Sequence, residues 1–257
     1  MIDGLYESHL AVLYVAAFIL VAVAAEFGSW IGRRPVGVGR AGVDVGTIAG
    51  AALGLLALLL AFSFSLALSR YEARRSVVLE EANAIGSTAN FALMLPEAAR
   101  GHVLGLLRDY VAVRIGLGVP FDPAKLERDV ARSVELQERL WQQAVAATAA
   151  NPQSLPIYRF VGSLNEVNNI HERRLTALRY RVPGGVMWLL LGVAMVAMGF
   201  TGYQSGLAGV RRPGATLIMS AMVAVVMLFV VDLDRPARGL IQVPVQALVD
   251  AQQSMPR

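Results

Sequence analysis

The sequence between residues 47 and 75 reads TIAGAALGLLALLLAFSFSLALSRYEARR. No charged residue occurs from Thr47 to Leu68, and about 20 helical residues suffice to cross a hydrocarbon core of about 30 Å. Three arginines, Arg70, Arg74 and Arg75, follow directly. The stretch therefore predicts a transmembrane helix that ends at a charged, water-facing boundary.

Three further stretches are long and apolar enough to cross a membrane: Leu10–Ile31, Gly185–Tyr203 and Gly214–Val231. We therefore expect an all-α membrane protein with four transmembrane helices in two hairpins and an inserted cytoplasmic helical domain. The expected divisions are residues 1–69 for the first hairpin, 70–182 for the helical domain, 183–234 for the second hairpin and 235–257 for a cytoplasmic C-terminal tail.

The composition agrees with this plan. Only 16% of the 257 residues are charged, against about 25% in an ordinary soluble domain. Of the 23 basic and 19 acidic residues, 27 lie between Arg70 and Val182, so this region has the charge density of a soluble domain. The absence of cysteine excludes a disulfide framework and thiolate zinc sites. The net charge of +4 fits arginines beside anionic lipid, and we expect no nucleic-acid partner.

Basic residues near the span ends predict the orientation. The two hairpin loops carry fewer of them than the opposite side, so the termini and the central region are expected in the cytoplasm. The loop arginines are Arg33, Arg34, Arg40, Arg211 and Arg212, and those opposite are Arg70, Arg74, Arg75, Arg173, Arg174, Arg179, Arg181, Arg235 and Arg238.

The central region is predicted to be helical throughout. One helix should run from Tyr71 to Leu95 and bury the stripe Val78, Ala82, Ile85, Ala89 and Ala92. A second should begin at Pro96 and end within 116–120, and a third should follow the Asp122 cap and run to about Ala150. The fourth should open after Leu155-Pro156 and end near Arg181. The third helix is expected to present Leu126, Val130, Trp141 and Val145 on one side, and the fourth Phe160, Leu164, Val167, His171 and Leu178.

The second span has two faces of interest. Small residues at Gly46, Gly50 and Gly54 predict close packing against another helix. Bulky residues at Leu55, Leu59, Phe62 and Leu66 form another face, which either contacts lipid or other helices or lines a dewetting constriction in an oligomer.

Asp232 and Asp234 at the end of the fourth span have two interpretations. They either pair with Arg235 and Arg238 in the headgroup region, or bind a hard metal cation through oxygen.

Within the fourth cytoplasmic helix, Asn165, Asn168, Asn169 and Glu172 predict a polar seam between helices or subunits. His171 is expected to be a satisfied core residue. Glu80 and Glu81 fit either a cation or arginine site, or an exposed helix face.

Catalytic signatures are scarce. The chain has three histidines, no cysteine, no Gly-rich phosphate loop and no His-Glu-x-x-His pair, and no base is placed beside a serine. We therefore expect no enzymatic activity and no cofactor.

Four segments resemble the bacterial bestrophin-like membrane proteins. They read LAFSFSLALSRYEARR (60–75), EEANAIG (80–86), NEVNNIHERR (165–174) and DLDRPARG (232–239). A wider similarity to bestrophin ion channels implies a homo-oligomer, a pentamer by this resemblance, in which the second span lines a central pore. Phe62 then falls near the apolar neck. The paired tryptophans of many bestrophins are absent, and the acidic calcium cluster is not recognisable beyond Asp232 and Asp234.

The resemblance thus implies an ion channel in the bacterial inner membrane, with the lipid bilayer, inorganic ions and other copies of itself as partners. We expect anions rather than cations to pass. The alternative is a non-conducting membrane scaffold or sensor, whose cytoplasmic helices bind a protein partner through the arginine-rich flanks and the polar seam.

Overall fold

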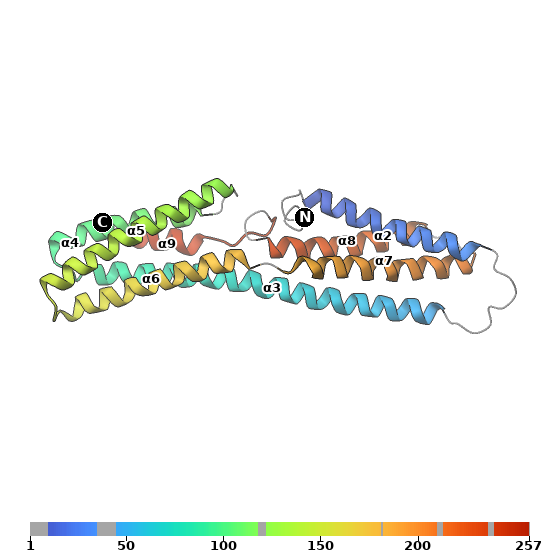
Figure 1. Ribbon diagram of the computed structural model, residues 1–257, viewed down its shortest axis with the longest axis horizontal. Coiled ribbons are helices and arrows are strands. Elements are labelled where there is room, and N and C mark those ends of the chain that lie inside the picture. The colour runs from blue at the N-terminus through green and yellow to red at the C-terminus, as the bar shows by residue number, and fades with distance from the viewer. Residues whose placement is uncertain are drawn as a thin grey trace. The chain divides into compact units, whose positions relative to one another are not determined.

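The computed structural model describes residues 10–34, 45–117, 122–180, 182–209, 213–235 and 239–256. The described residues form helices and connecting turns, without a strand. The helices, labelled in Figure 1, are α2 (Leu10–Arg33), α3 (Val45–Ala92), α4 (Glu97–Gly116), α5 (Pro123–Ala150), α6 (Leu155–Arg179), α7 (Gly184–Leu207), α8 (Pro213–Asp234) and α9 (Gln246–Ser254). Four helical stretches are apolar enough to span a membrane, which confirms the predicted all-α membrane fold.

The chain divides into two compact units. The first unit consists of Met1–Ser69 and Arg181–Arg235, and the second of Arg70–Tyr180 and Pro236–Arg257. The helix expected from Tyr71 continues the second span without a break, because α3 is a single 48-residue helix. Some of the arginines that predict the orientation lie outside the described residues, namely Arg40, Arg181, Arg211, Arg212 and Arg238.

In the first unit, α2 packs on α7 and α8. Glycines bring the backbones of α2 and α7 together. A Cβ atom added at Gly202 of α7 would collide with the carbonyl of Ala25, and one at Gly28 of α2 with the carbonyl of Gly199. Gly32 and Gly206 continue this contact along the same two helices. Within hydrocarbon, no hydrophobic effect drives two helices together, so close packing of this kind is what holds them in contact. We call these residues the glycine seam.

The core of the first unit joins these helices to α3. Leu56 and Leu60 of α3 are buried with Leu190 and Met198 of α7 and Met227 of α8. Many other apolar side chains of the spans are exposed on the single chain, as expected of surfaces that face lipid or another subunit.

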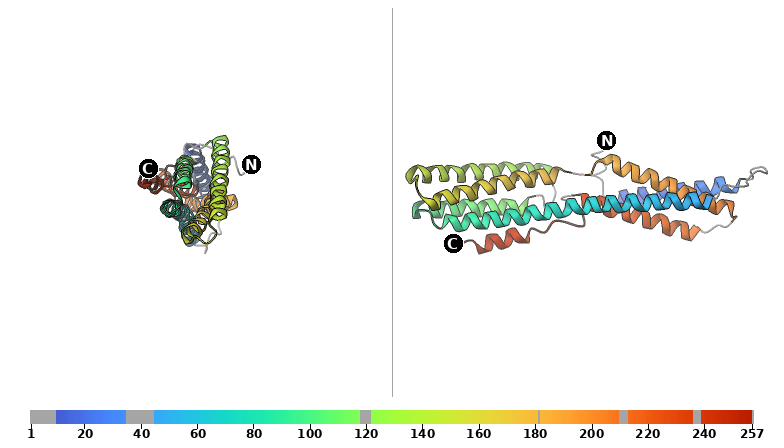
Figure 2. Two further views of the ribbon diagram at one scale, coloured as in Figure 1. Left: turned by 90° about the vertical axis from the view of Figure 1, so that its left-hand side faces the viewer. Right: turned by 90° about the horizontal axis from the view of Figure 1, so that it is seen from below.

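The second unit is a helical bundle of α4, α5, α6, α9 and the end of α3, whose helices lie lengthwise beside one another (Figure 2). Helix α5 begins as predicted, because the Asp122 carboxylate accepts a hydrogen bond of 3.0 Å from the Ala124 N–H. Ser154 caps α6 by accepting from the Ile157 N–H at 3.4 Å.

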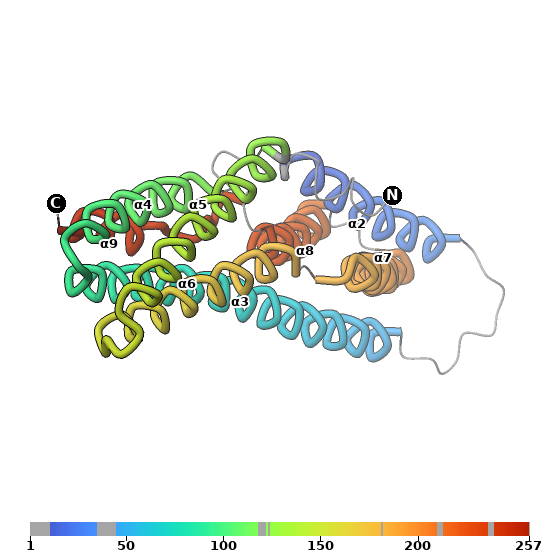
Figure 3. Tube along the Cα trace, turned by 60° about the vertical axis from the view of Figure 1, so that its left-hand side comes forward, coloured from blue at the N-terminus to red at the C-terminus, as the bar shows by residue number. Residues whose placement is uncertain are grey.

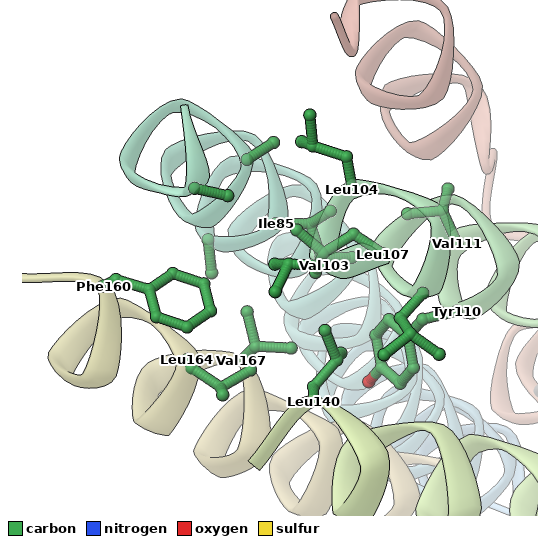
Figure 4. Close-up of a cluster of buried hydrophobic side chains, with 14 of the residues drawn as sticks. Ile85, Val103, Leu104, Leu107, Tyr110, Val111, Leu140, Phe160, Leu164 and Val167 are labelled. Carbon is green, nitrogen blue, oxygen red and sulfur yellow. The ribbon is translucent and has the colours of Figure 1, made fainter. Parts of the chain in front are cut away.

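Apolar stripes of four helices meet in the core of the second unit. Figure 4 shows Phe160, Leu164 and Val167 of α6 pointing toward Ile85 of α3 and Val103 of α4. The stripe predicted on α3 is buried along its whole length, from Val78 to Ala92. On α6 the stripe from Phe160 to His171 is buried as expected.

The face predicted for α5 is correct in its first half, where Leu126 and Val130 are half-buried, and wrong in its second half. Trp141 and Val145 are exposed, whereas Leu136, Leu140 and Ala144 are buried. The buried residues recur at steps of four, so they also satisfy helical periodicity. Periodicity shows that an apolar stripe exists, but it does not choose between two overlapping stripes on one helix.

The C-terminal segment belongs to the second unit. Leu248 of α9 is fully buried in its core, and Arg108 of α4 donates a hydrogen bond to the Pro256 carbonyl. Helix α9 lies beside α4 (Figure 3). Leu248 and Met255, which lie in the predicted C-terminal tail (235–257), thus contribute side chains to the bundle core.

Candidate functional site

The membrane-spanning part of α3 has one covered face. Ala49, Leu56, Leu60, Ser63 and Ala67 are buried, at steps of seven, four, three and four. The rest of the helix surface in this part is largely open on the single chain.

The bulky face predicted from the sequence lies mainly on the open side. Phe62 is 65% exposed, and Leu55 and Leu66 are exposed as well. Leu59 differs, because it is half-buried against the core of the first unit. Three of the four candidate residues are therefore available to a pore, a second copy or lipid, and Leu59 borders that surface.

Two glycines of the small-residue stripe, Gly50 and Gly54, have open space beside them in the described part of the chain. No atom lies within 4 Å of where a Cβ would stand on Gly50 or Gly54. Gly46 is half-buried. A packing role for these glycines stays a prediction. The close glycine contact inside the chain is the glycine seam of α2 and α7, which the sequence reasoning did not single out.

A buried ionic cluster connects three helices of the second unit. Glu81 of α3 pairs with Arg114 of α4, with 2.5 Å between Oε1 and Nε, and with Arg174 of α6 through its other oxygen. The side chains of Glu81 and Arg114 are 0% exposed. Arg174 also donates to the carbonyl of Arg114 at 3.2 Å. One carboxylate thus holds two guanidinium groups, and of the two interpretations of Glu80 and Glu81 the arginine site is confirmed for Glu81.

Tyr110 and His171 complete this cluster. The Tyr110 hydroxyl lies 3.4 Å from both Glu81 Oε1 and His171 Nδ1, and Arg114 Nη1 lies 3.1 Å from the same Nδ1. Because an arginine can only donate, Nδ1 of His171 is the acceptor, and a neutral ring carries its proton on Nε2. Burial and the nearby Arg114 lower the pKa of His171 to about 4. The ring is therefore neutral at pH 7, and His171 is buried as expected.

Burial also acts on the other members of the cluster. It raises the pKa of the Tyr110 phenol above its ordinary value and lowers the pKa of Arg174. With His171 and Tyr110 neutral, one carboxylate and two arginines leave a net charge of +1 in the buried cluster. Removing the Glu81 carboxylate would leave two buried guanidinium groups without a counter-charge, which is strongly destabilising.

The predicted polar seam on α6 is mostly at the surface. Asn165, Asn169 and Glu172 are exposed, and Asn168 is half-buried with its Oδ1 atom buried and without a hydrogen-bond partner among the described residues. Asn168 is therefore the residue of the predicted seam whose buried side-chain oxygen lacks a hydrogen-bond donor among the described residues. The role of the whole seam as an interface stays a prediction.

Asp232 and Asp234 are both buried at the end of α8. The two carboxylate oxygens of Asp234 accept from the Val182 N–H at 2.9 and 3.0 Å, two residues before α7 begins. Arg238 lies outside the described residues, so its pairing stays a prediction. Within the described ranges, no group of three or more His, Asp or Glu side chains could hold a metal. A metal at this pair stays a prediction. The structure gives the Asp234 carboxylate another role, which is to accept the Val182 N–H.

The comparisons with known proteins agree on one fold. The structure of a bacterial bestrophin homologue from Klebsiella pneumoniae, phased on zinc, is 13% identical and aligns with a TM-score of 0.67, covering 96% of this chain and 100% of that one. A single-site variant of that homologue is 14% identical, with a TM-score of 0.66 over 96% and 98% of the two chains. A further structure, described as a membrane protein variant, is 13% identical with a TM-score of 0.69 over 96% and 100%.

These identities are low, so the structural likeness establishes the shared fold. No curated protein matches the sequence. The sequence of residues 11–248 matches the Bestrophin-like domain family. This match extends from α2 to α9 and includes both units. The chain therefore belongs to the bestrophin-like family of membrane proteins.

Proposed function

We propose that this protein is a bestrophin-type oligomeric ion channel of the bacterial inner membrane, with α3 lining its pore and anions as the preferred ions. The termini and the second unit lie in the cytoplasm in this proposal, and the oligomer is a pentamer by family resemblance. It works without a cofactor and has no enzymatic activity.

The open face of α3 is the observation that carries the proposal. Phe62 is 65% exposed on a helix whose opposite face is packed against its own chain. If several copies place this face toward one axis, their phenylalanine and leucine side chains form an apolar ring. Such a ring can stop ion flow by expelling water from the narrowest part of a pore.

The charge pattern of α3 supports an anion preference. Between Val45 and Ser69 the helix carries no carboxylate, and its first charged residue is Arg70. Cation channels usually present rings of Asp or Glu, and anion pores present rings of Arg or Lys. An α3-lined pore would therefore meet positive charge first where the apolar span ends.

Ion flux from liposomes that contain the purified full-length protein tests this proposal. Phe62→Ala should raise chloride flux several-fold above wild type, because the shorter side chain widens and hydrates the ring. Phe64→Ala is the matched control, since Phe64 is the same residue type two positions along α3, where a helix presents nearly the opposite side. It should leave flux near the wild-type level.

Two results would contradict the channel. One is an absence of flux in wild type and Phe62→Ala when both are folded and inserted, which would favour the non-conducting scaffold. The other is an equal increase in Phe62→Ala and Phe64→Ala, which would place no constriction at Phe62. Sodium gradients in the same liposomes test the anion preference, because sodium flux equal to chloride flux would contradict it.

A further inference from the structure

A basic groove lies between α3 and α6 in the second unit. It has a volume of about 450 Å³ and is lined mainly by Arg70, Ala73, Arg74, Arg173, Thr176 and Tyr180. Three arginines from two helices thus share one groove. Glu172 is the one acidic residue of the lining. We call this feature the α3–α6 groove.

The arginines of the α3–α6 groove differ in how well they are neutralised. Arg173 pairs with Glu80, with 2.7 Å between Nη1 and Oε2. Arg74 is buried. Arg70 is half-buried, and its Nε atom is buried without a hydrogen-bond partner in the described part of the chain. With three arginines and one acidic residue in its lining, the groove as a whole carries positive charge and favours an anion.

The position of the groove along the chain places it at headgroup depth. Arg70 is the first charged residue after the apolar span of α3, and Arg74 is one helical turn further on. At 1.5 Å per residue, these two residues lie roughly 3 to 9 Å beyond Leu68. The headgroup region extends about 5 to 7 Å beyond the hydrocarbon on each side of a bilayer. Tyr180, four residues before α7 begins, is an exposed aromatic of the kind found at this boundary.

We propose that the α3–α6 groove binds a phosphate group, and that an anionic phospholipid headgroup is its source. Arginine matches phosphate oxygens with two parallel N–H donors. Thr176 and Tyr180 line the same groove, and a hydroxyl group is able to donate to a glycerol or phosphate oxygen. The proposal requires the membrane fold and does not require that the protein conducts ions.

Thermal unfolding of the full-length protein in an uncharged detergent tests this site. Dioctanoyl-phosphatidylglycerol should raise the unfolding temperature of wild type in a saturable way, whereas dioctanoyl-phosphatidylcholine should have a smaller effect. Arg70→Gln should weaken the apparent affinity by about tenfold or more, because a charge-assisted hydrogen bond is lost. Arg70→Lys should recover part of it. Arg173→Gln is a second variant that also lines the groove, should Arg70→Gln fold poorly.

Arg75→Gln is the matched control, since Arg75 is exposed on the same helix and is not part of the groove lining. It should bind phosphatidylglycerol like wild type. Inorganic phosphate separates the two sources of the ligand. If phosphate stabilises wild type and competes with the lipid, the groove is a phosphate site that also accepts free anions. If only the lipid acts, the headgroup is the ligand.

Three results would overturn the proposal. The first is that neither probe stabilises wild type. The second is that phosphatidylglycerol stabilises both Arg70→Gln and Arg173→Gln as much as it stabilises wild type. The third is that Arg75→Gln loses as much affinity for phosphatidylglycerol as those two variants do. A response to neither probe, together with a changed oligomer mass in Arg70→Gln, would assign the groove to contact with a second copy.

Discussion

Replacing Glu81 by glutamine should destabilise the second unit far more than its single atom change suggests. The glutamine would keep the shape of the side chain but leave the guanidinium groups of Arg114 and Arg174 without a counter-charge. The side chains of Glu81, Arg114 and Arg174 are at most 7% exposed. Breaking a buried ion pair by removing one partner costs about 3 to 5 kcal/mol, which is a large part of the roughly 5 to 15 kcal/mol of a typical domain.

Thermal unfolding in detergent, followed by circular dichroism, measures the effect. At about 2 to 4 °C per kcal/mol for a chain of this size class, Glu81→Gln should lower Tm by roughly 6 to 20 °C. The neighbouring variant Glu80→Gln is the control, because Glu80 and Arg173 form a pair whose side chains are 37% and 54% exposed. An exposed pair contributes about 1 kcal/mol or less, so its Tm should change by less than about 4 °C.

The double variant Glu81→Gln with Arg114→Gln isolates the interaction from the substitution itself. Removing both partners should cost less than the sum of the two single changes, because the stranded charge of Arg114 is then absent. Equal Tm values for Glu81→Gln and Glu80→Gln would refute the reasoning. So would strict additivity in the double variant.

Two further predictions concern pH and packing. His171 has a pKa of about 4 in the folded chain against 6.5 when unfolded, so between these values the unfolded chain binds more protons and stability falls as pH falls. His171→Gln should remove up to about 3 kcal/mol of that pH dependence, measured as the difference between the two stability profiles from pH 7 to pH 4, and parallel profiles would contradict this. Gly202→Ala should destabilise the first unit by about 1 to 3 kcal/mol through overpacking, because its Cβ would meet the Ala25 carbonyl. Gly192→Ala on the same helix, where the space is open, should unfold near the wild-type temperature, and equal effects of the two would argue against the glycine seam.

The sequence was sufficient for the spans and for most helix limits. Long uncharged runs such as Thr47–Leu68 have few alternatives to a membrane helix, because backbone groups in hydrocarbon must be satisfied within the segment. The Asp122 cap and the breakers around Pro96 act locally, so the starts of α4 and α5 were predicted correctly. Local signals of this kind do not depend on which helices become neighbours.

Features that depend on neighbours were harder to predict. Gly50 and Gly54 have the same small-residue spacing as the glycine seam, yet among the described residues it is Gly28 that approaches the Gly199 carbonyl and Gly202 that approaches the Ala25 carbonyl. Spacing identifies a helix face that can pack closely, but the identity of its partner is a tertiary property. The exposed Trp141 on α5 shows the same difficulty for a helix that is not among the candidate membrane spans.

The two arginines of the ionic cluster can be recognised in the sequence by their position on apolar helix stripes. Arg114 continues the apolar stripe of Val103, Leu107 and Tyr110 at steps of four, three and four. Arg174 likewise follows His171 on the apolar stripe of α6. A lone charge in phase with buried positions predicts a buried ion. Its partner, Glu81 on α3, could not be identified without the fold.

The glycine seam has a consequence for biosynthesis. Helix α2 ends at Arg33, and its seam partner α7 begins only at Gly184. The ribosome must therefore translate about 150 residues between the two, which takes roughly 8 to 30 s at about 5 to 20 residues per second. If the chain is inserted as it is synthesised, the glycine face of α2 has no α7 to pack against during this interval. Lipid or the insertion machinery has to shield that face until the second hairpin emerges.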